Sequence, residues 1–113
     1  MSLETSDEKG HTLSKNIIQV IKHIPKGKVA TYGQIAGLAG NPNASRVVVW
    51  TLNSSSKTEN LPWYRVINSK GTISLKRGAG YEEQRKLLES EGVVFDENDK
   101  INLKEFQWRD ISF

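Results

Sequence analysis

The sequence predicts a mainly helical domain with a small β-hairpin. Apolar residues recur at helical spacing in four segments, whereas β-branched residues gather in one short stretch. The length of 113 residues suits a single domain with one modest core. We therefore expect a folded domain over residues 13–109, a disordered acidic tail over residues 1–12 and a short C-terminal tail over residues 110–113.

The first predicted helix runs from Ser14, its expected N-cap, to Ile24, and Pro25 closes it. The segment is long enough for about three helical turns. Its inward face is expected to carry Ile17, Val20, Ile21 and Ile24.

Two short helices are expected next, one over residues 32–39 and one over residues 44–53. Thr31 and Gln34 form the pattern of a capping box, and Asn43 is the expected N-cap of the second helix. The inward residues of the first helix are predicted to be Ile35, Leu38 and Ala39. Two helices joined by a few residues that include glycine form a helix-turn-helix, whose second helix enters a DNA groove.

The β-hairpin is predicted over residues 65–68 and 72–75, which carry β-branched side chains on either side of a turn at Gly71. A last helix is expected over residues 81–91, ended by Gly92. One side of this helix is predicted to hold Tyr81, Gln84, Leu87 and Leu88.

Charge is unevenly distributed along the chain, whose net charge is +3. Residues 12–81 hold ten basic residues and one acid, Glu59, whereas residues 1–11 and 82–113 carry net charges of −2 and −4. A basic middle section with acidic ends is typical of a domain with one face against a polyanion. A solvated basic face without a partner explains the charge alone equally well.

The composition excludes several kinds of chemistry. The absence of cysteine removes disulfides, thiolate metal sites and any thiol nucleophile. No histidine and carboxylate pair has metal-ligand spacing, so we expect no catalytic residue, no metal and no cofactor. No stretch approaches the ~20 apolar residues that cross a bilayer, so we expect a soluble intracellular protein without a transmembrane or signal segment.

Aromatic and arginine side chains in the basic section remain as candidate functional residues. Tyr32 begins one short helix, Arg46 lies in the first turn of the next, and Trp63 follows Pro62. An arginine on a groove-facing helix can contact phosphates or replace a displaced base, and a tryptophan can stack on a flipped base. Each residue alone also has a purely structural explanation, since a tryptophan after proline usually belongs to a core.

Residues 62–69 read Pro-Trp-Tyr-Arg-Val-Ile-Asn-Ser, which resembles the Pro-Cys-His-Arg-Val active-site motif of O6-alkylguanine-DNA alkyltransferases. Tryptophan replaces the acceptor cysteine, as it does in the alkyltransferase-like subgroup. Similar segments also occur at residues 24–36, 71–74 and 89–93. The resemblance implies a winged helix-turn-helix-like domain, similar to the C-terminal DNA-binding domain of these enzymes.

The same resemblance implies roles for individual residues. Tyr32 matches the tyrosine that presses on the phosphate beside the lesion, and Arg46 matches the arginine that takes the place of the flipped nucleotide. Thr31 and Ser45 are expected to contact DNA beside them. Trp63 matches the acceptor position and would form one wall of the lesion pocket. The other expected pocket residues are Pro62, Val66, Ile73, Ser74 and Leu75.

Departures from the family pattern bear on activity and on docking. Tyr64 stands where the family has the histidine of a hydrogen-bonded relay to the thiol, and Glu91 matches the acid of that relay. The thiol and the histidine are therefore both missing. Val49 and Thr51 stand where the family usually has small residues, with Trp50 between them, and this bulk is expected to hinder the approach to the minor groove.

The leading hypothesis is a monomeric lesion sensor that is not an enzyme. It binds O6-alkylguanine in duplex DNA through the minor groove, flips the base into a tryptophan-lined pocket without dealkylating it, and directs it to nucleotide excision repair proteins. The expected compartment is the nucleus in a eukaryote and the cytoplasm in a bacterium. Two alternatives stay open: an alkyltransferase or glycosylase that uses a group other than cysteine, and a sequence-specific helix-turn-helix regulator.

Overall fold

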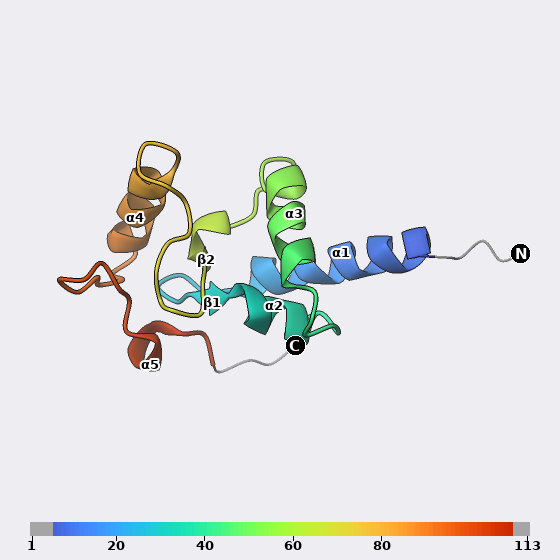
Figure 1. Ribbon diagram of the computed structural model, residues 1–113, viewed down its shortest axis with the longest axis horizontal. Helices are drawn as coiled ribbons and strands as arrows, with labels where there is room; N and C mark the ends of the chain where they lie inside the picture. Colours follow the sequence, from blue (N-terminus) through green and yellow to red (C-terminus); the bar gives the residue numbers. More distant parts are fainter. Residues whose placement is uncertain (1–5, 110–113) are drawn as a thin grey trace, which may run out of the picture. The chain divides into compact units, whose positions relative to one another are not determined.

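Three helices dominate the first part of the computed structural model, which describes residues 6–109 (Figure 1). Helix α1 spans Ser6–His23, α2 spans Tyr32–Leu38 and α3 spans Ser45–Ser55. The three helices pack against one another. The mainly helical fold class is thereby confirmed.

The described chain folds into two compact units that alternate along the sequence. The first unit contains residues 6–23 and 32–63, and the second contains residues 24–31 and 64–109. Each unit has buried apolar residues of its own. The predicted limits of one domain over residues 13–109 stay a prediction.

Helix α1 has the predicted inward face but not the predicted start. Ile17, Val20 and Ile21 are at most 4% exposed. The helix begins at Ser6 rather than Ser14, so residues 6–12, which were expected to belong to a disordered tail, are helical. Glutamate and lysine favour a helix, and a helix that has started is extended at little further cost. Residues 1–5 and the predicted tail 110–113 lie outside the described residues.

Helix α2 begins at Tyr32 as predicted, but its buried face differs by one residue. Ile35, Ala36 and Ala39 are buried, whereas Leu38 is 39% exposed. The small Ala36 takes the inward position because it allows α2 to lie close to its neighbours. Asn16 of α1 fixes the end of α2 by donating its side-chain amide to the Ala39 carbonyl at 3.2 Å.

The small sheet of the second unit is a parallel pair, not the predicted hairpin. Strand β1, Ala30–Thr31, pairs with β2, Val66–Ile67. Residues 72–75 form a loop instead of a second hairpin strand. A local turn takes the place of the hairpin: Asn68 Oδ1 accepts hydrogen bonds from the backbone amides of Lys70 and Thr72, and the Asn68 amide donates to the Thr72 carbonyl at 3.2 Å.

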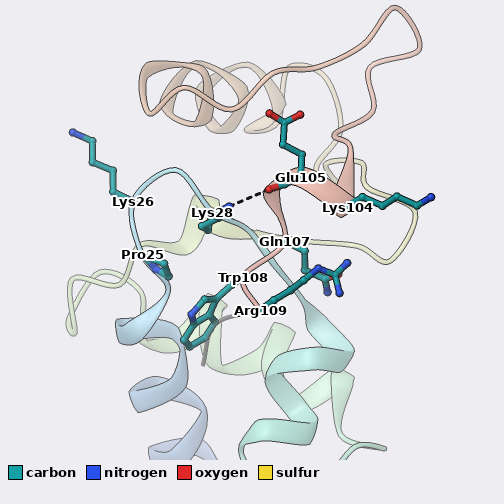
Figure 2. A pocket seen from close by; sticks show the side chains of 8 residues that line it. All are labelled: Pro25, Lys26, Lys28, Lys104, Glu105, Gln107, Trp108 and Arg109. Carbon is teal, nitrogen blue, oxygen red and sulfur yellow. Dashed lines mark hydrogen bonds between the residues drawn. The ribbon is translucent and has the colours of Figure 1, made fainter. Parts of the chain in front are cut away.

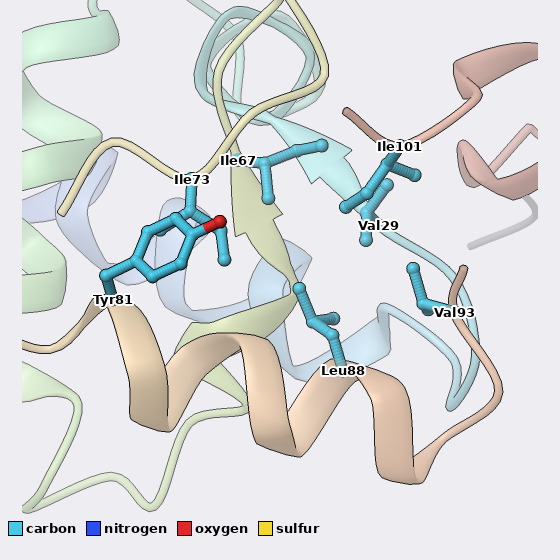
Figure 3. Packing of buried hydrophobic residues seen from close by; sticks show 7 residues of the cluster. All are labelled: Val29, Ile67, Ile73, Tyr81, Leu88, Val93 and Ile101. Carbon is cyan, nitrogen blue, oxygen red and sulfur yellow. The ribbon is translucent and has the colours of Figure 1, made fainter. Parts of the chain in front are cut away.

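Helix α4, Tyr81–Ser90, covers the core of the second unit (Figure 3). Tyr81, Gln84 and Leu88 are buried as predicted, while Leu87 is half-buried. The core cluster consists of Val29, Ile67, Ile73, Tyr81, Leu88, Val93 and Ile101. Helix α5, Leu103–Phe106, is a further short element of this unit, and a 3-10 helix, η1, spans Trp63–Arg65, of which Tyr64 and Arg65 belong to the second unit.

Gly71 is required where the loop of the second unit meets the core. Its φ is +83°, and a Cβ at this position would lie 2.6 Å from the carbonyl oxygen of Ile101. The Ile101 amide donates to the Gly71 carbonyl at 2.8 Å. Only glycine permits this close approach with a left-handed backbone.

Candidate nucleic-acid interface

The turn between α2 and α3 brings the beginnings of these two helices together. Gly40, with φ +110°, ends α2, and its amide and that of Asn41 bond back to the carbonyls of Gly37 and Ala36. Ser45 Oγ lies 3.9 Å from the position of a Cβ on Gly33, so the first turn of α3 borders the first turn of α2. The helix-turn-helix predicted from the spacing is therefore formed.

The predicted N-cap of α3 is wrong. Ala44, not Asn43, precedes the helix, and no side chain caps it. Asn43 instead belongs to the turn, where its amide donates to the side-chain oxygen of Asn41 at 3.1 Å. By accepting this bond, the Asn41 side chain orders the turn locally.

Two of the predicted DNA-contacting residues lie at the beginnings of these helices. Tyr32 is the first residue of α2 and is half-buried. Arg46 is the second residue of α3, is exposed, and has no ion-pair or hydrogen-bond partner among residues 6–109. Ser45 is half-buried in the same turn, while Thr31 is 8% exposed at the end of β1. Arg46 therefore has the freedom that a DNA-contacting side chain needs.

The predicted lesion-pocket residues are divided between the two units. Pro62 and Trp63 are half-buried in the first unit, and Trp63 begins η1 with its amide donating to the Leu61 carbonyl at 2.8 Å. In the second unit, Val66 and Ile73 are buried, whereas Ser74 and Leu75 are exposed. Pocket formation by these residues therefore stays a prediction.

Glu91 is held by three groups of the second unit. Its carboxylate accepts from the Tyr64 hydroxyl at 2.9 Å, from Arg65 Nε at 2.9 Å and from the Gly27 amide at 3.0 Å. Arg65 Nη2 pairs with Glu91 Oε2, and Arg65 Nη1 donates to the Ile24 carbonyl. The Glu91 side chain is only 6% exposed and that of Arg65 14%. The cluster ties η1 to the end of α4 and to the loop after α1.

The electrostatics of this cluster keep Glu91 ionised and Tyr64 neutral. Burial raises the pKa of Glu91, but the hydrogen bonds from Arg65, Gly27 and Tyr64 outweigh burial and lower the pKa overall. Burial and the bond to Glu91 raise the pKa of the Tyr64 phenol. A phenol with a raised pKa is a poor proton acceptor near neutral pH, so Tyr64 does not reproduce the histidine of a thiol relay.

Arg65 is the residue whose role the sequence analysis missed. It belongs to the motif around Trp63, which does not indicate its partner. An arginine that follows two aromatic residues in a short turn gives no local signal of its partner, because Glu91 lies 26 positions further along the chain. Bidentate pairing of the guanidinium with a carboxylate appears only when the second unit folds.

A hollow in the second unit is lined by none of the predicted site residues. Its volume is about 430 Å³, and its lining is rich in basic side chains (Figure 2). The eight lining residues are Pro25, Lys26, Lys28, Lys104, Glu105, Gln107, Trp108 and Arg109. Lys28 Nζ donates to the Glu105 carbonyl at 3.0 Å, and Arg109 donates to the Leu103 carbonyl at 3.3 Å. The two cations are therefore engaged by backbone oxygens.

Within residues 6–109, no three histidine, cysteine, aspartate or glutamate side chains come together in a way that would hold a metal ion. None of the helices in this range has the length and apolar character that a membrane span requires.

The fold and the site define a class of protein: a small domain that presents a helix-turn-helix with an exposed arginine. The sequence profile described as "6-O-methylguanine DNA methyltransferase, DNA binding domain" matches residues 12–93. The chain belongs to this family and is alkyltransferase-like, with tryptophan at the acceptor position.

The similarity to two relatives extends over nearly their whole length. A DNA base-flipping protein of Vibrio parahaemolyticus is 47% identical over 93 residues, which are 82% of this chain and 92% of the relative. Alkyltransferase-like protein 1 of Schizosaccharomyces pombe is 39% identical over 98 residues, covering 82% of this chain and 91% of the relative.

Solved structures of proteins from the same family are similar to this chain. The crystal structure of S. pombe Atl1 in complex with damaged DNA containing O6-carboxymethylguanine matches with a TM-score of 0.74 and 35% identity, over 96% of this chain and 99% of that one. O6-methylguanine methyltransferase of Mycobacterium tuberculosis matches with a TM-score of 0.58 and 30% identity, over 69% of this chain and 47% of the enzyme. The similarity to the enzyme thus covers about half of its length.

Proposed function

We propose that this protein is a non-catalytic sensor of alkylation damage in DNA. It binds duplex DNA that contains O6-alkylguanine through α2 and α3 in the minor groove. Arg46 fills the place of the flipped nucleotide, Tyr32 presses on the adjacent phosphate, and Trp63 forms a wall of the pocket that receives the base. The alkyl group stays on the base, and the lesion passes to nucleotide excision repair proteins.

The observation that carries this proposal is what has become of the relay in the second unit. Tyr64 occupies the position of the relay histidine, and its hydroxyl donates to Glu91 instead of taking a proton from a nucleophile. Arg65 completes the pairing of the carboxylate. The chain also contains no cysteine. The missing thiol and the replaced histidine therefore support binding of the lesion without transfer of its alkyl group.

The names of the relatives support binding to damaged DNA. The Vibrio and Escherichia coli relatives are named DNA base-flipping proteins, and Atl1 has been crystallised with damaged DNA. The basic middle section of this chain adds electrostatic attraction to any duplex, which weakens as salt rises. We assign affinity mainly to these charges and discrimination to the pocket.

Physical chemistry explains why a tryptophan suits the acceptor position of a sensor. An extruded O6-alkylguanine presents a flat aromatic face and an apolar substituent, and an indole contacts both favourably. Extrusion of a base costs a few kcal/mol, and the cost is lower when an alkyl group weakens pairing. Selectivity thus arises partly in the pocket and partly in the DNA.

A binding titration combined with an assay of lesion loss tests the proposal. The purified protein is titrated with a duplex containing O6-methylguanine and with the same duplex containing guanine, at one stated salt concentration. We expect tighter binding to the lesion and full recovery of the lesion after prolonged incubation. Loss of the alkyl group or of the base would identify an enzyme. Equal affinity for both duplexes, with preference for one sequence, would identify a regulator.

The transfer to excision repair requires its own experiment. Purified excision-repair proteins are given the lesion duplex with and without this protein, and incision is measured. We expect more incision in its presence, and no stimulation with the Arg46→Ala variant. Unchanged incision with the wild-type protein would contradict this part of the proposal. The nucleus of a eukaryote or the cytoplasm of a bacterium is the compartment in which such a transfer would occur.

A further inference from the structure

The exposed face of α3 carries two large apolar side chains beside Arg46. Val49 is 43% exposed and Trp50 is 62% exposed. Positions 46, 49, 50 and 53 follow one another at spacings of three and four residues, so they share one helix face, and Arg46 and Asn53 on it are exposed as well. The opposite side of α3 is fully buried at Val48 and Thr51.

The burial of Thr51 separates the three bulky residues that the sequence placed together. Thr51 faces the interior of the first unit and cannot meet a ligand of the exposed face. Val49 and Trp50, called here the apolar pair, are the two that remain on the face of Arg46. Bulk on α3 is therefore a property of the apolar pair alone.

The charge and shape of this face indicate its occupant. The sequence of α3 contains no acidic residue, and Arg46 is free of an ion pair within the described range. A polyanion that approaches α3 therefore finds the positive charge of Arg46 and no carboxylate of this helix that would repel it. The minor groove of duplex DNA combines phosphates along its edges with deoxyribose rings inside, and apolar side chains are commonly inserted there.

We propose that the apolar pair is a DNA contact, with Trp50 packing against deoxyribose rings of the minor groove next to Arg46. This contact supplies affinity for duplex DNA that does not depend on neutralising phosphates. The inference rests on the proposed function, because it requires α3 to face DNA. It replaces the expectation that bulk on α3 hinders docking, since the same bulk becomes contact area.

The test compares two substitutions of one exposed residue. Trp50→Ala removes the indole and Trp50→Phe keeps much of its apolar area, while Val94→Ala, at a site 63% exposed in the second unit, is the matched control. Each variant is titrated with the O6-methylguanine duplex and the undamaged duplex at several salt concentrations. Circular dichroism verifies that each variant is folded.

We expect Trp50→Ala to weaken binding to both duplexes about tenfold. In the wild-type protein DNA would cover roughly half of the exposed indole area, and the variant loses the free energy of this burial. The ratio between the two duplexes and the dependence of log K on log salt should stay unchanged, since no phosphate contact is lost. Trp50→Phe should lose much less, and Val94→Ala nothing. The fluorescence of Trp50 is the difference between the wild-type protein and Trp50→Phe. Bound DNA should reduce the quenching of this fluorescence by acrylamide.

Three outcomes would overturn the inference, and a fourth separates it from the proposed function. Unchanged affinity of Trp50→Ala would remove the contact, and tighter binding would restore the interpretation of a steric obstacle. Self-association that Trp50→Ala abolishes would assign the apolar pair to an interface between copies of the chain. A wild-type protein that binds both duplexes equally, with both weakened by Trp50→Ala, would refute lesion sensing while supporting the contact.

Discussion

Arg46 and Trp63 differ in what the fold requires of them. Arg46 is exposed near the start of α3 and has no partner in the described part of the chain. Trp63 is half-buried and begins η1. A free, exposed side chain can be removed without cost to the fold, whereas a half-buried indole contributes to packing. The two residues therefore need different experiments.

Arg46→Ala should weaken binding to a lesion duplex by about tenfold or more, because the side chain that replaces the flipped nucleotide is lost. The free energy of unfolding should change by less than ~0.5 kcal/mol, as expected for an exposed residue without partners. Fluorescence anisotropy and urea unfolding measure the two quantities. Lys100→Ala, an exposed basic residue of the second unit, is the control for loss of charge. Equal effects of both substitutions would contradict a specific role for Arg46.

Trp63→Ala should lower the affinity ratio between alkylated and normal guanine more than it lowers affinity for undamaged DNA. The reason is that the indole contacts the extruded base, whereas undamaged DNA is held mainly through its phosphates. Titrations with the two matched duplexes measure the ratio, and Trp63→Phe should retain part of it. If the ratio stays constant while stability falls, Trp63 is a packing residue.

At the scale of elements, the cluster formed by Glu91, Tyr64, Arg65 and the amide of Gly27, called here the Glu91 clamp, holds η1 in place. Its carboxylate joins the end of α4 to Arg65, Tyr64 and the amide of Gly27. Pairing of this kind offsets the desolvation of two buried charges only while both partners are present. The conformation of Tyr64 and Arg65 consequently depends on a residue near the end of α4.

Glu91→Gln should destabilise the protein by roughly 3 kcal/mol at pH 7, because Arg65 is left as an uncompensated charge. The folded pKa of Glu91 is lowered from its usual 4.5, so its contribution is complete above pH 4.5 and is lost as the pH falls through the folded pKa. The difference between wild type and variant in urea unfolding should therefore shrink below pH 4.5.

Glu89→Gln is the control for the same chemical change at an exposed position of α4. It should alter stability by less than ~0.5 kcal/mol. Some dependence on acid remains in either variant, since the pKa values of Glu82 and Asp99 are lowered as well, Glu82 mainly by the Gly78 amide and Asp99 mainly by Arg85. A wild-type protein whose advantage over Glu91→Gln is constant from pH 7 to pH 3 would contradict the clamp.

At the scale of the whole molecule, the absence of cysteine and the replaced relay act together. A thiol restored at the acceptor position still lacks a neighbour that can take its proton, because Tyr64 donates to Glu91 and the pKa of Tyr64 is raised. In the proposed sensor, two separate positions would have to change before alkyl transfer is possible, and we expect that reversing one of them is not enough.

Trp63→Cys should consequently transfer few alkyl groups from DNA to protein. The double variant Trp63→Cys, Tyr64→His should transfer more, because an imidazole beside Glu91 can accept the thiol proton. Label on the protein after incubation with DNA labelled on the alkyl group measures transfer, with circular dichroism as a check of folding. Efficient transfer by the single variant would show that the relay is dispensable.

Local patterns in the sequence determined the helices and the helix-turn-helix. The spacing of Ile17, Val20 and Ile21 predicted the inner face of α1, and the cap and glycine signals located α2 and the end of α4. The motif around Trp63 indicates the family without knowledge of the fold, because it depends only on the identities of residues that follow one another in the chain. Signals of this kind involve neighbours within one or two helical turns.

Only the tertiary structure decided which distant residues meet. The parallel pairing of β1 with β2, the clamp between Arg65 and Glu91, and the burial of Thr51 beneath an exposed Trp50 all depend on packing between separate segments. A hairpin was expected because residues 65–75 are close in sequence, yet Val66 and Ile67 pair with β1, and the Asn68 side chain accepts from the Thr72 amide in a local turn. The sequence cannot show such a pairing by itself, because the partner of a backbone group is decided only when packing brings a separate segment beside it.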